Sequence, residues 1–255
     1  MERRTAIGPF ADMPVSIRVG TAGWSLPRDV QARFPVEGTH LARYATRLSA
    51  VEINSSFYRP HRQATYARWA QSVGPDFRFA VKLPKTITHE RRLADSGEPL
   101  ARFADEISGL GDTLGPILVQ LPPSLGFDRG IAGAFLRTLR RFIPTQAVIE
   151  PRHPAWFTAA ADDLLVAHGI ARVAADPAPV PGASEPGGWR GFTYLRLHGS
   201  PQIYRSDYGA DAIEAYARSA MQAAATSETW VIFDNTASGA ATANALALSD
   251  CVGAG

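Results

Sequence analysis

Lysine is almost missing from this sequence of 255 residues, because 24 of its 26 basic side chains are arginine. The two lysines, Lys82 and Lys85, both lie in the stretch FRFAVKLPKTITHE, where a strand-like segment runs into a polar loop. A general excess of arginine over lysine is a bias of composition and indicates no function. The placement of both ammonium groups at the end of one predicted strand is more specific, and the neighbouring strands help to interpret it.

Cysteine occurs once, as Cys251, so an internal disulfide and a zinc site built from several cysteines are excluded. No apolar run approaches the roughly 18 residues that a membrane-spanning helix needs, and the N-terminal stretch lacks the continuous apolar core of a secretory signal. The net charge of +2 is small and the arginines are dispersed, which favours no nucleic-acid partner by itself. We therefore expect a cytoplasmic protein without a membrane partner.

Short segments rich in Val, Ile, Leu and Phe recur along the chain and alternate with stretches of helical spacing. Eight segments are predicted strands: 17–20, 50–54, 77–83, 116–121, 147–150, 170–175, 192–197 and 230–234. Seven stretches between and after them are predicted helices: 39–48, 63–73, 98–110, 129–142, 158–168, 210–226 and 238–248. Alternation of this kind indicates a parallel sheet, since a parallel connection needs a crossover.

Eight strand and helix units in about 250 residues predict an α/β fold, a single (β/α)8 TIM-type barrel of parallel strands. The barrel domain is expected over residues 17–248, with an N-terminal extension at 1–16 and a tail at 249–255. An open, doubly wound sheet is the alternative, but GTAGW after the first strand has the wrong glycine spacing for a dinucleotide-binding fingerprint. The segment 176–191 is too rich in Pro and Gly for a helix, and we expect an irregular excursion or a lid in place of the sixth helix.

Alternation along the predicted strands places polar side chains on the face that points into the barrel. In FRFAVKL, Val81 and Leu83 share the outer face, so Lys82 points inward. The same test on other strands selects polar residues at or just past their C-terminal ends: Glu52, Asn54, Gln120, Glu150, Arg152, Arg196 and His198. Active sites of such barrels lie at this end, which predicts a candidate site at the barrel mouth.

Ionised groups are costly to bury unless they pair with one another or meet a ligand. A structural network, with the pairs Glu52–Lys82 and Glu150–Arg196, is therefore the alternative to an active site. Further polar and aromatic residues in the loops past these strands are predicted to contact a substrate: Tyr58, His89, His153, Trp156, Tyr204 and Asn235.

The motifs VEINSSFYR, FAVKLPKTITH, ILVQLPP, IEPRHPAWF and YLRLHG, together with an early GTAGW and a late FDNT, occur between about residues 17 and 248. In this order the chain resembles the YecE-like family, also catalogued as domain-of-unknown-function family 72. The resemblance implies a TIM-type barrel, and it implies no particular biochemical activity. The motif positions are therefore candidates for the site and not assigned catalysts.

The predicted catalytic residues are Glu52, Lys82, Glu150 and His198. Either glutamate can act as a general base if its pKa is raised toward neutrality, with His198 as the complementary acid. Arg152 and Arg196 offer guanidinium groups for a phosphate or carboxylate.

Two roles are open for Lys82. Next to Glu52 it stays charged and stabilises an oxyanion, which we favour; in a drier and more cationic pocket it becomes a Schiff-base nucleophile. The expected function is therefore acid–base chemistry of an isomerase, lyase or phosphoesterase type on a small polar or anionic substrate, such as a sugar phosphate or nucleotide.

Two other functions remain open. A glycoside hydrolase needs two carboxylates, for which Glu52 and Glu150 are candidates, and aromatic platforms for sugar rings. A non-catalytic nucleic-acid or nucleotide binding protein can use surface arginines, here Arg59, Arg62, Arg91, Arg92, Arg140 and Arg141. Binding of the second kind weakens steeply with salt.

No cofactor is predicted. A divalent metal has possible ligands in Glu52, Glu150, His153, His198 and Asp234, but no closely spaced histidine pair is present. Nearby ammonium and guanidinium groups also repel a metal cation. We therefore predict no metal residues.

Overall fold

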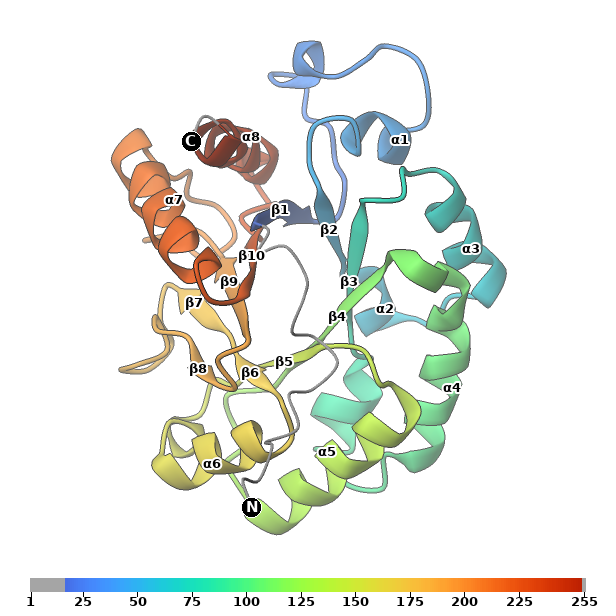
Figure 1. Cartoon of the computed structure of the whole chain (residues 1–255), viewed down its shortest axis with the longest axis vertical. Coiled ribbons are helices and arrows are strands. Elements are labelled where there is room, and N and C mark those ends of the chain that lie inside the picture. Colours follow the sequence, from blue (N-terminus) through green and yellow to red (C-terminus); the bar gives the residue numbers. More distant parts are fainter. Residues whose placement is uncertain (1–16, 254–255) are drawn as a thin grey trace, which may run out of the picture.

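A computed structural model describes residues 17–253 of the chain, so the predicted N-terminal extension lies outside the described residues. A sheet of ten strands is rolled into a nearly closed barrel, and helices surround it (Figure 1). The strands are β1 (Ile17–Ala22), β2 (Ala50–Ile53), β3 (Arg78–Lys82), β4 (Leu114–Gln120), β5 (Ala147–Glu150), β6 (Ala171–Arg172), β7 (Ala174–Asp176), β8 (Gly187–Gly188), β9 (Phe192–Leu197) and β10 (Glu228–Phe233).

The strand order in the sheet is β7-β9-β10-β1-β2-β3-β4-β5-β6-β8. All neighbouring pairs are parallel except β6 with β8, which are antiparallel. The prediction of a parallel, barrel-like α/β fold is confirmed. The strict eight-strand barrel is not observed.

The departure from eight strands lies in the predicted strand 170–175, which is divided into β6 and β7 at Val173. The first part pairs with β5 and the second with β9, so one residue links the strand next to one edge of the sheet to the strand at the other edge. The backbone N–H of Val173 still donates to the carbonyl of Ile149, at 2.9 Å. The two halves of the predicted strand therefore pair with different strands. The hydrophobic residues of the segment do not predict that it is divided in this way.

The Pro/Gly-rich segment between β7 and β9 contains no helix, and it contributes β8 to the edge of the sheet. Gly188 has a φ of 62°, and a Cβ there would lie 2.6 Å from the carbonyl oxygen of Ile170. Only glycine allows this approach to β6. The composition that breaks the helix therefore also permits the short antiparallel pair.

The helices lie close to the predicted ranges, with shorter turns added between them. The α-helices are α1 (His40–Tyr44), α2 (Ser55–Tyr58), α3 (Gln63–Gln71), α4 (Gly97–Ile107), α5 (Arg129–Phe142), α6 (Ala159–Ala167), α7 (Ala210–Ala224) and α8 (Ala240–Gly253). A π-helical turn, η2, covers Thr86–Glu90, and 3-10 turns cover η1 (Gln31–Arg33), η3 (Ser108–Thr113) and η4 (Pro154–Trp156).

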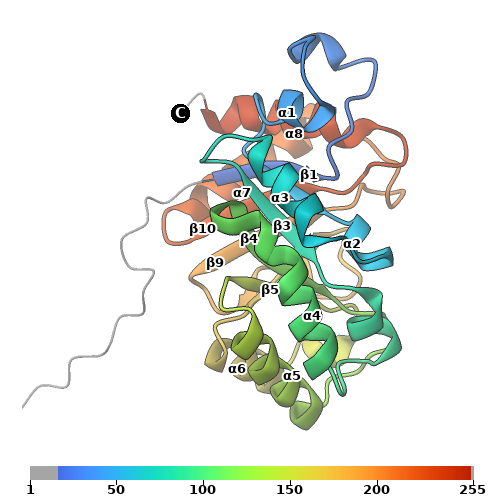
Figure 2. The same ribbon diagram turned by 90° about the vertical axis from the view of Figure 1, so that its right-hand side faces the viewer.

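One difference from the predicted helices lies near the C-terminal end of the described residues. Helix α8 packs against β1 and extends into the predicted tail, as far as Gly253. After a quarter turn, α5 and α6 lie at the opposite end of the molecule from α1 and α8 (Figure 2).

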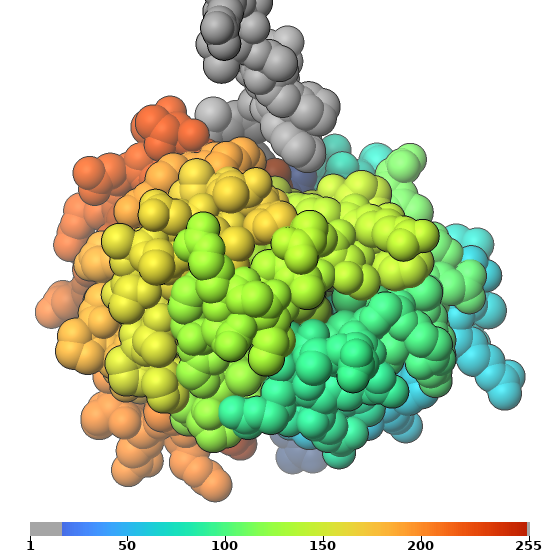
Figure 3. All heavy atoms as spheres, turned by 90° about the horizontal axis from the view of Figure 1, so that it is seen from below, coloured from blue at the N-terminus to red at the C-terminus, as the bar shows by residue number. Residues whose placement is uncertain are grey.

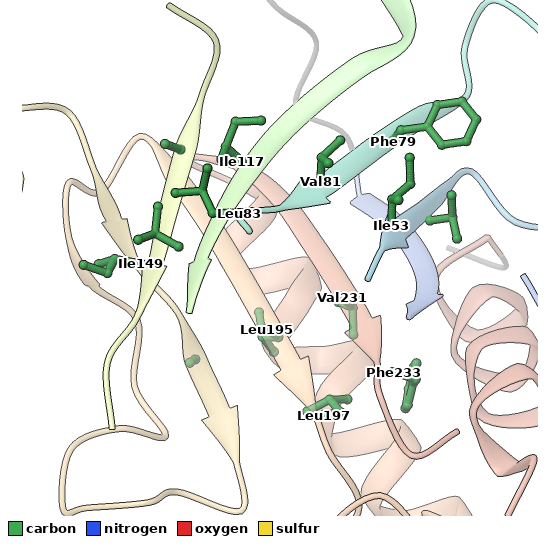
Figure 4. Close-up of a cluster of buried hydrophobic side chains, with 14 of the residues drawn as sticks. Ile53, Phe79, Val81, Leu83, Ile117, Ile149, Leu195, Leu197, Val231 and Phe233 are labelled. Atoms are coloured by element: carbon green, nitrogen blue, oxygen red, sulfur yellow. The ribbon is translucent and has the colours of Figure 1, made fainter. Parts of the chain in front are cut away.

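The strands bury two different hydrophobic layers, as the alternation of their side chains predicts. The outer layer faces the helices and includes Ile53, Val81 and Leu195 (Figure 4). The inner cluster fills the barrel below its mouth: Ala50, Ala80, Leu118, Val148, Ala171, Val173, Phe192, Tyr194, Trp230 and Ile232. This inner cluster closes the barrel on one side, so polar groups at the strand ends are left to line the other side.

The surface seen from below is formed by the α5 and α6 region, coloured lime to yellow, and by the teal-green region near the π-helical turn (Figure 3). Among residues 17–253, no helix has both the length and the apolar character needed to cross a membrane.

Candidate active site

Arg196 on β9 is the centre of the polar group at the barrel mouth. Its side chain is fully buried and forms a two-point contact with Glu52, with Nη2 to Oε1 at 2.7 Å and Nε to Oε2 at 3.1 Å. Nη1 donates to Glu150 Oε2 at 3.1 Å, and Nη2 lies 3.0 Å from Asp234 Oδ2. One guanidinium therefore binds three carboxylates, which come from β2, from β5 and from the residue after β10.

The charges in this group hold one another in the ionised form. Burial alone lowers the pKa of Arg196, but Asp234, Glu52 and Glu150 outweigh it and raise the pKa well above its ordinary value. Burial likewise raises the pKa of Glu150, but Arg196, His198 and Arg152 outweigh it and hold this pKa well below its usual range. The condition we set for Glu150 as a general base, a pKa raised toward neutrality, is not met.

His198 bridges two of the same carboxylates. Its Nδ1 lies 3.0 Å from Asp234 Oδ2, and its Nε2 lies 2.9 Å from Glu150 Oε1. Both partners are carboxylates that accept hydrogen bonds, so this arrangement favours the imidazolium form, in which both ring nitrogens donate. Burial lowers the pKa of His198, but the charge of Glu150 and the hydrogen bonds to Asp234 and Glu150 together outweigh burial and raise it. His198 can therefore act as an acid, but both of its ring nitrogens are hydrogen-bonded to the carboxylates of Asp234 and Glu150.

Tyr194 supports this group from below, where its hydroxyl donates to Glu52 Oε2 at 2.8 Å. Because this bond is buried and its acceptor is charged, we expect Tyr194→Phe to lower the free energy of unfolding by about 1.5–3 kcal/mol. Tyr66→Phe is the matched control, since the Tyr66 hydroxyl is buried without a hydrogen-bond partner among the described residues. Urea denaturation checks both variants, and equal losses would contradict the assigned role of the Tyr194 hydroxyl.

Lys82 stands apart from the Arg196 group although it lies at the same mouth. Its side chain ends β3 and is only 8% exposed, with Nζ 4.3 Å from the centre of the Phe57 ring. Within residues 17–253, no carboxylate forms an ion pair with it. The proposed Glu52–Lys82 pair is not formed because Arg196 binds both oxygens of Glu52.

The surroundings of Lys82 weaken its hold on a proton. Burial and then the positive charge of Arg196 lower the pKa of Lys82 to about 8, while Glu52, Glu150 and Asp234 oppose this effect. Glu52 is bound to Arg196 and does not form the ion pair with Lys82 that our preferred role assumes. Burial and the charge of Arg196 are the surroundings expected for the second role, in which part of the amine is neutral.

Several other predicted residues lie around Lys82. His89, in the π-helical turn, packs edge-on against Phe57 with ring centres 5.0 Å apart. Burial lowers the pKa of His89, and Lys82 and Arg152 lower it further, so the three basic side chains share one region of positive potential. Arg152 bonds Glu150 through Nη2 at 3.2 Å and remains partly exposed.

Four other predicted residues lie at or past the ends of the strands. Gln120, buried at the end of β4, is in register with Glu150, and Tyr204 packs edge-on against His198 with ring centres 5.7 Å apart. Asn54 and Asn235 follow β2 and β10, and the Oδ1 atom of each is buried without a partner among the described residues. Buried acceptors are normally satisfied, so these two atoms are exceptions among the described residues.

Three predicted residues do not join this group. Trp156 belongs to the outer hydrophobic layer, where its indole N–H donates to the carbonyl of Leu125 at 3.0 Å. His153 Nδ1 accepts from the N–H of Ala155 at the start of a 3-10 turn. Tyr58 is 72% exposed and lines a pocket of about 300 Å³ between α2, the π-helical turn and α4, which none of the inner polar residues lines.

Tyr194 and Phe57 are absent from the predicted set, and Asp234 appears there only as a possible metal ligand. The alternation test that selected Arg196 also selects Tyr194, two residues earlier on β9, and Asp234, two residues past the inward Ile232. These two were within reach of the sequence pattern. Phe57 carried no such signal, because it lies in α2 and contacts Lys82 only through the fold.

The described part of the chain contains no group of three or more His, Cys, Asp and Glu side chains arranged to hold a metal ion. The carboxylates of Glu52, Glu150 and Asp234 converge, but on the guanidinium of Arg196. A positive charge already occupies the place where a metal cation would need oxygen ligands.

Comparison with known proteins shows which family the chain resembles. The model of the family described as "Protein of unknown function DUF72" matches residues 18–255. The UPF0759 protein YecE of Escherichia coli K12 is 28% identical over 174 residues, which are 64% of this chain and 60% of that protein. Its counterpart in Escherichia coli O157:H7 is 28% identical over 159 residues, or 60% of this chain and 55% of that protein. The match therefore spans less than two thirds of each relative's length.

Solved structures show the same fold. A DUF72 family protein from Enterococcus faecalis V583 superposes with a TM-score of 0.78 at 20% identity, covering 93% of this chain and 96% of that one. Another from Thermotoga maritima MSB8 has a TM-score of 0.75 at 24% identity, covering 93% of this chain and 99% of that one. The family match over nearly the whole chain confirms the resemblance seen in the motifs, and the chain belongs to the DUF72 family.

Proposed function

We propose that the barrel mouth is an active site for acid–base chemistry on a small anionic substrate. The observation that carries this proposal is the buried Lys82 side chain, which has no ion-pair partner among residues 17–253 while Arg196 binds the three nearest carboxylates. A buried cation without a partner is costly, and a ligand that brings negative charge removes that cost.

The surroundings of Lys82 favour an anion over a neutral ligand. Arg152 and His89 contribute basic groups to the same region, since burial, Lys82 and then Arg152 lower the pKa of His89. A guanidinium that is partly exposed can bind a carboxylate or phosphate through two N–H groups. The substrate class that fits is a small compound with a phosphate or carboxylate group.

The paired-glutamate mechanism of a glycoside hydrolase fits less well. It needs one carboxyl that is protonated and within reach of the glycosidic oxygen. Glu150 is buried, bonded to Arg196 and His198, and its pKa is held well below the usual range by these cations. The carboxyl of Glu150 is therefore neither protonated nor accessible to a sugar.

A nucleic-acid surface is also less well supported, because several of the surface arginines are held by the protein. Arg140 donates to the carbonyls of Thr145, His168 and Gly169, and Arg92 donates to Ser124. Guanidinium groups fixed in this way stabilise loops and have fewer donors left for phosphates.

Thermal unfolding with inorganic phosphate, sugar phosphates and short carboxylic acids tests the proposed function. A ligand at about 100 times its Kd adds about 2.7 kcal/mol of stability, which raises the Tm by about 5–10 °C for a domain of this size. We expect such a shift for at least one anion in the wild type and its loss in Lys82→Met and Arg152→Met.

Lys85→Met is the matched control, because Lys85 is the other lysine, is half exposed and pairs with Glu90 at 3.3 Å. It should keep the full shift. If only oligonucleotides raise the Tm, equally in all variants and only at low salt, the proposed active site is wrong and the protein is a nucleic-acid binder.

A further inference from the structure

Resting on the proposed anion site, we propose that Lys82 forms a Schiff base with a small aldehyde or ketone that carries an anionic group. Four features of the described residues support this inference. They are the position of the amine, its freedom from ion pairs, a neighbouring imidazole, and a guanidinium placed for the anionic group.

Strand β3 and helix α2 together place the Lys82 amine. The residue ends β3, and its carbonyl accepts a bond from Ser56 Oγ at 2.7 Å, so α2 is tied to the end of this strand. The neighbouring Phe57 then places its ring 4.3 Å from Nζ. An amine held in this way at a barrel mouth meets a ligand with little loss of side-chain freedom.

The charges around Lys82 leave part of the amine neutral, which a nucleophile requires. Facing it are Glu52 from β2, Glu150 from β5, Arg196 from β9, Asp234 after β10 and His89 from the π-helical turn. Burial and Arg196 lower the pKa of this amine to about 8. At pH 7 roughly a tenth of it is therefore neutral, against fewer than roughly one in a thousand for an ordinary lysine.

The chemistry balances without a further reactant. The neutral amine attacks the carbonyl carbon, a C–N bond forms, and the carbonyl oxygen takes a proton to give a carbinolamine. The hydroxyl then takes a second proton and leaves as water, and nitrogen loses its protons to leave C=N. The sum is amine plus carbonyl compound giving imine plus water, and only protons have to be moved.

His89 is the group that can move these protons. Burial and its cationic neighbours lower its pKa, so the ring is largely neutral at pH 7, and it packs on the same Phe57 ring as Lys82. His198 is less suited, because both of its nitrogens are bonded to carboxylates. Arg152, partly exposed beside Glu150, is placed to hold the anionic group of the carbonyl compound.

Trapping with cyanoborohydride tests the inference. The wild type is incubated with pyruvate, a ketone with a carboxylate, or with dihydroxyacetone phosphate, a ketone with a phosphate. Reduction of the imine leaves a mass gain equal to the probe minus one oxygen atom, and peptide mapping locates it. We expect at least one probe to label Lys82 in preference to Lys85 by about tenfold or more, and the probe that does so identifies the anionic group.

The pH dependence and two variants sharpen the test. The preference for Lys82 over Lys85 in one sample should be largest near pH 7 and should fall as the pH approaches 10, where an ordinary lysine also loses its proton. His89→Gln should slow labelling of Lys82 by about 10²-fold without moving the label, and Lys82→Arg should abolish it. The mapping uses the wild type, so it remains decisive if a variant fails to fold.

The outcomes separate this inference from the proposed function. Lactate resembles pyruvate but has no ketone. If either compound raises the Tm of the wild type but not of Lys82→Met, and no probe labels Lys82, the Schiff base is wrong and the anion site stands. If neither a Tm shift nor a label at Lys82 occurs, both fail. Labelling spread over Lys82, Lys85 and the N-terminal amine in proportion to exposure also overturns the Schiff base.

Discussion

Replacing Arg196 with methionine is expected to lower the free energy of unfolding by about 3–5 kcal/mol, a large part of the stability of an ordinary domain. The reason is that three buried carboxylates, Glu52, Glu150 and Asp234, lose the guanidinium that they share. Methionine fills similar space, so the loss reports charge and not volume. Chemical denaturation at pH 7 measures it.

The loss should depend on pH in one direction. In the wild type the pKa values of Glu150 and Asp234 are lowered, because Arg196 and His198 outweigh burial, so the stability they add is present above their unfolded pKa values and lost as the pH falls. Without Arg196, burial opposes their ionisation. The difference between variant and wild type should therefore shrink between pH 7 and about pH 4.

Arg102→Met is the control for Arg196→Met, since Arg102 is exposed and pairs with Glu98 on the same helix. A loss below about 1 kcal/mol is expected there. A loss at Arg196 as small as that at Arg102, or one that is the same at both pH values, would contradict the role of Arg196 as the shared partner of the buried carboxylates.

Truncating Trp230 to alanine is expected to cost about 3–5 kcal/mol as well, for a different reason. Trp230 is fully buried in the inner cluster and stacks on Tyr194 with ring centres 6.0 Å apart and planes inclined by 16°. A Cβ on Gly115 would lie 2.7 Å from the Trp230 ring, so the ring fits against bare backbone. Alanine leaves a cavity beneath the tyrosine that holds Glu52.

Trp189→Ala is the matched control, because Trp189 is a tryptophan at the margin of the same cluster and is only half-buried. It should lose clearly less stability than Trp230→Ala. The anion-dependent Tm shift should also be weakened by Trp230→Ala and kept by Trp189→Ala. Similar losses in both variants would show that the inner cluster does not support the site.

The site was largely accessible from sequence because strands impose a period of two. Lys82, Glu52, Glu150, Arg196 and His198 were all selected by alternation, and all five are buried at the mouth. The direction of side chains in the segments that follow the strands was harder to predict. The side chains of Trp156 and Tyr58 follow the same strands, but one turns into the outer layer and the other into solvent, and no periodic pattern fixes the direction of a loop residue.

The sequence by itself determined the parallel α/β architecture, the family and the set of charged residues that face inward, because each follows from local patterns or from motifs along the chain. Only the tertiary structure decided how those charges pair. Glu52 and Arg196 are 144 positions apart and lie on strands that are not neighbours in the sheet. Rolling the sheet into a barrel brings them together, and because Arg196 then binds Glu52, Glu150 and Asp234, Lys82 is left without an ion-pair partner among residues 17–253.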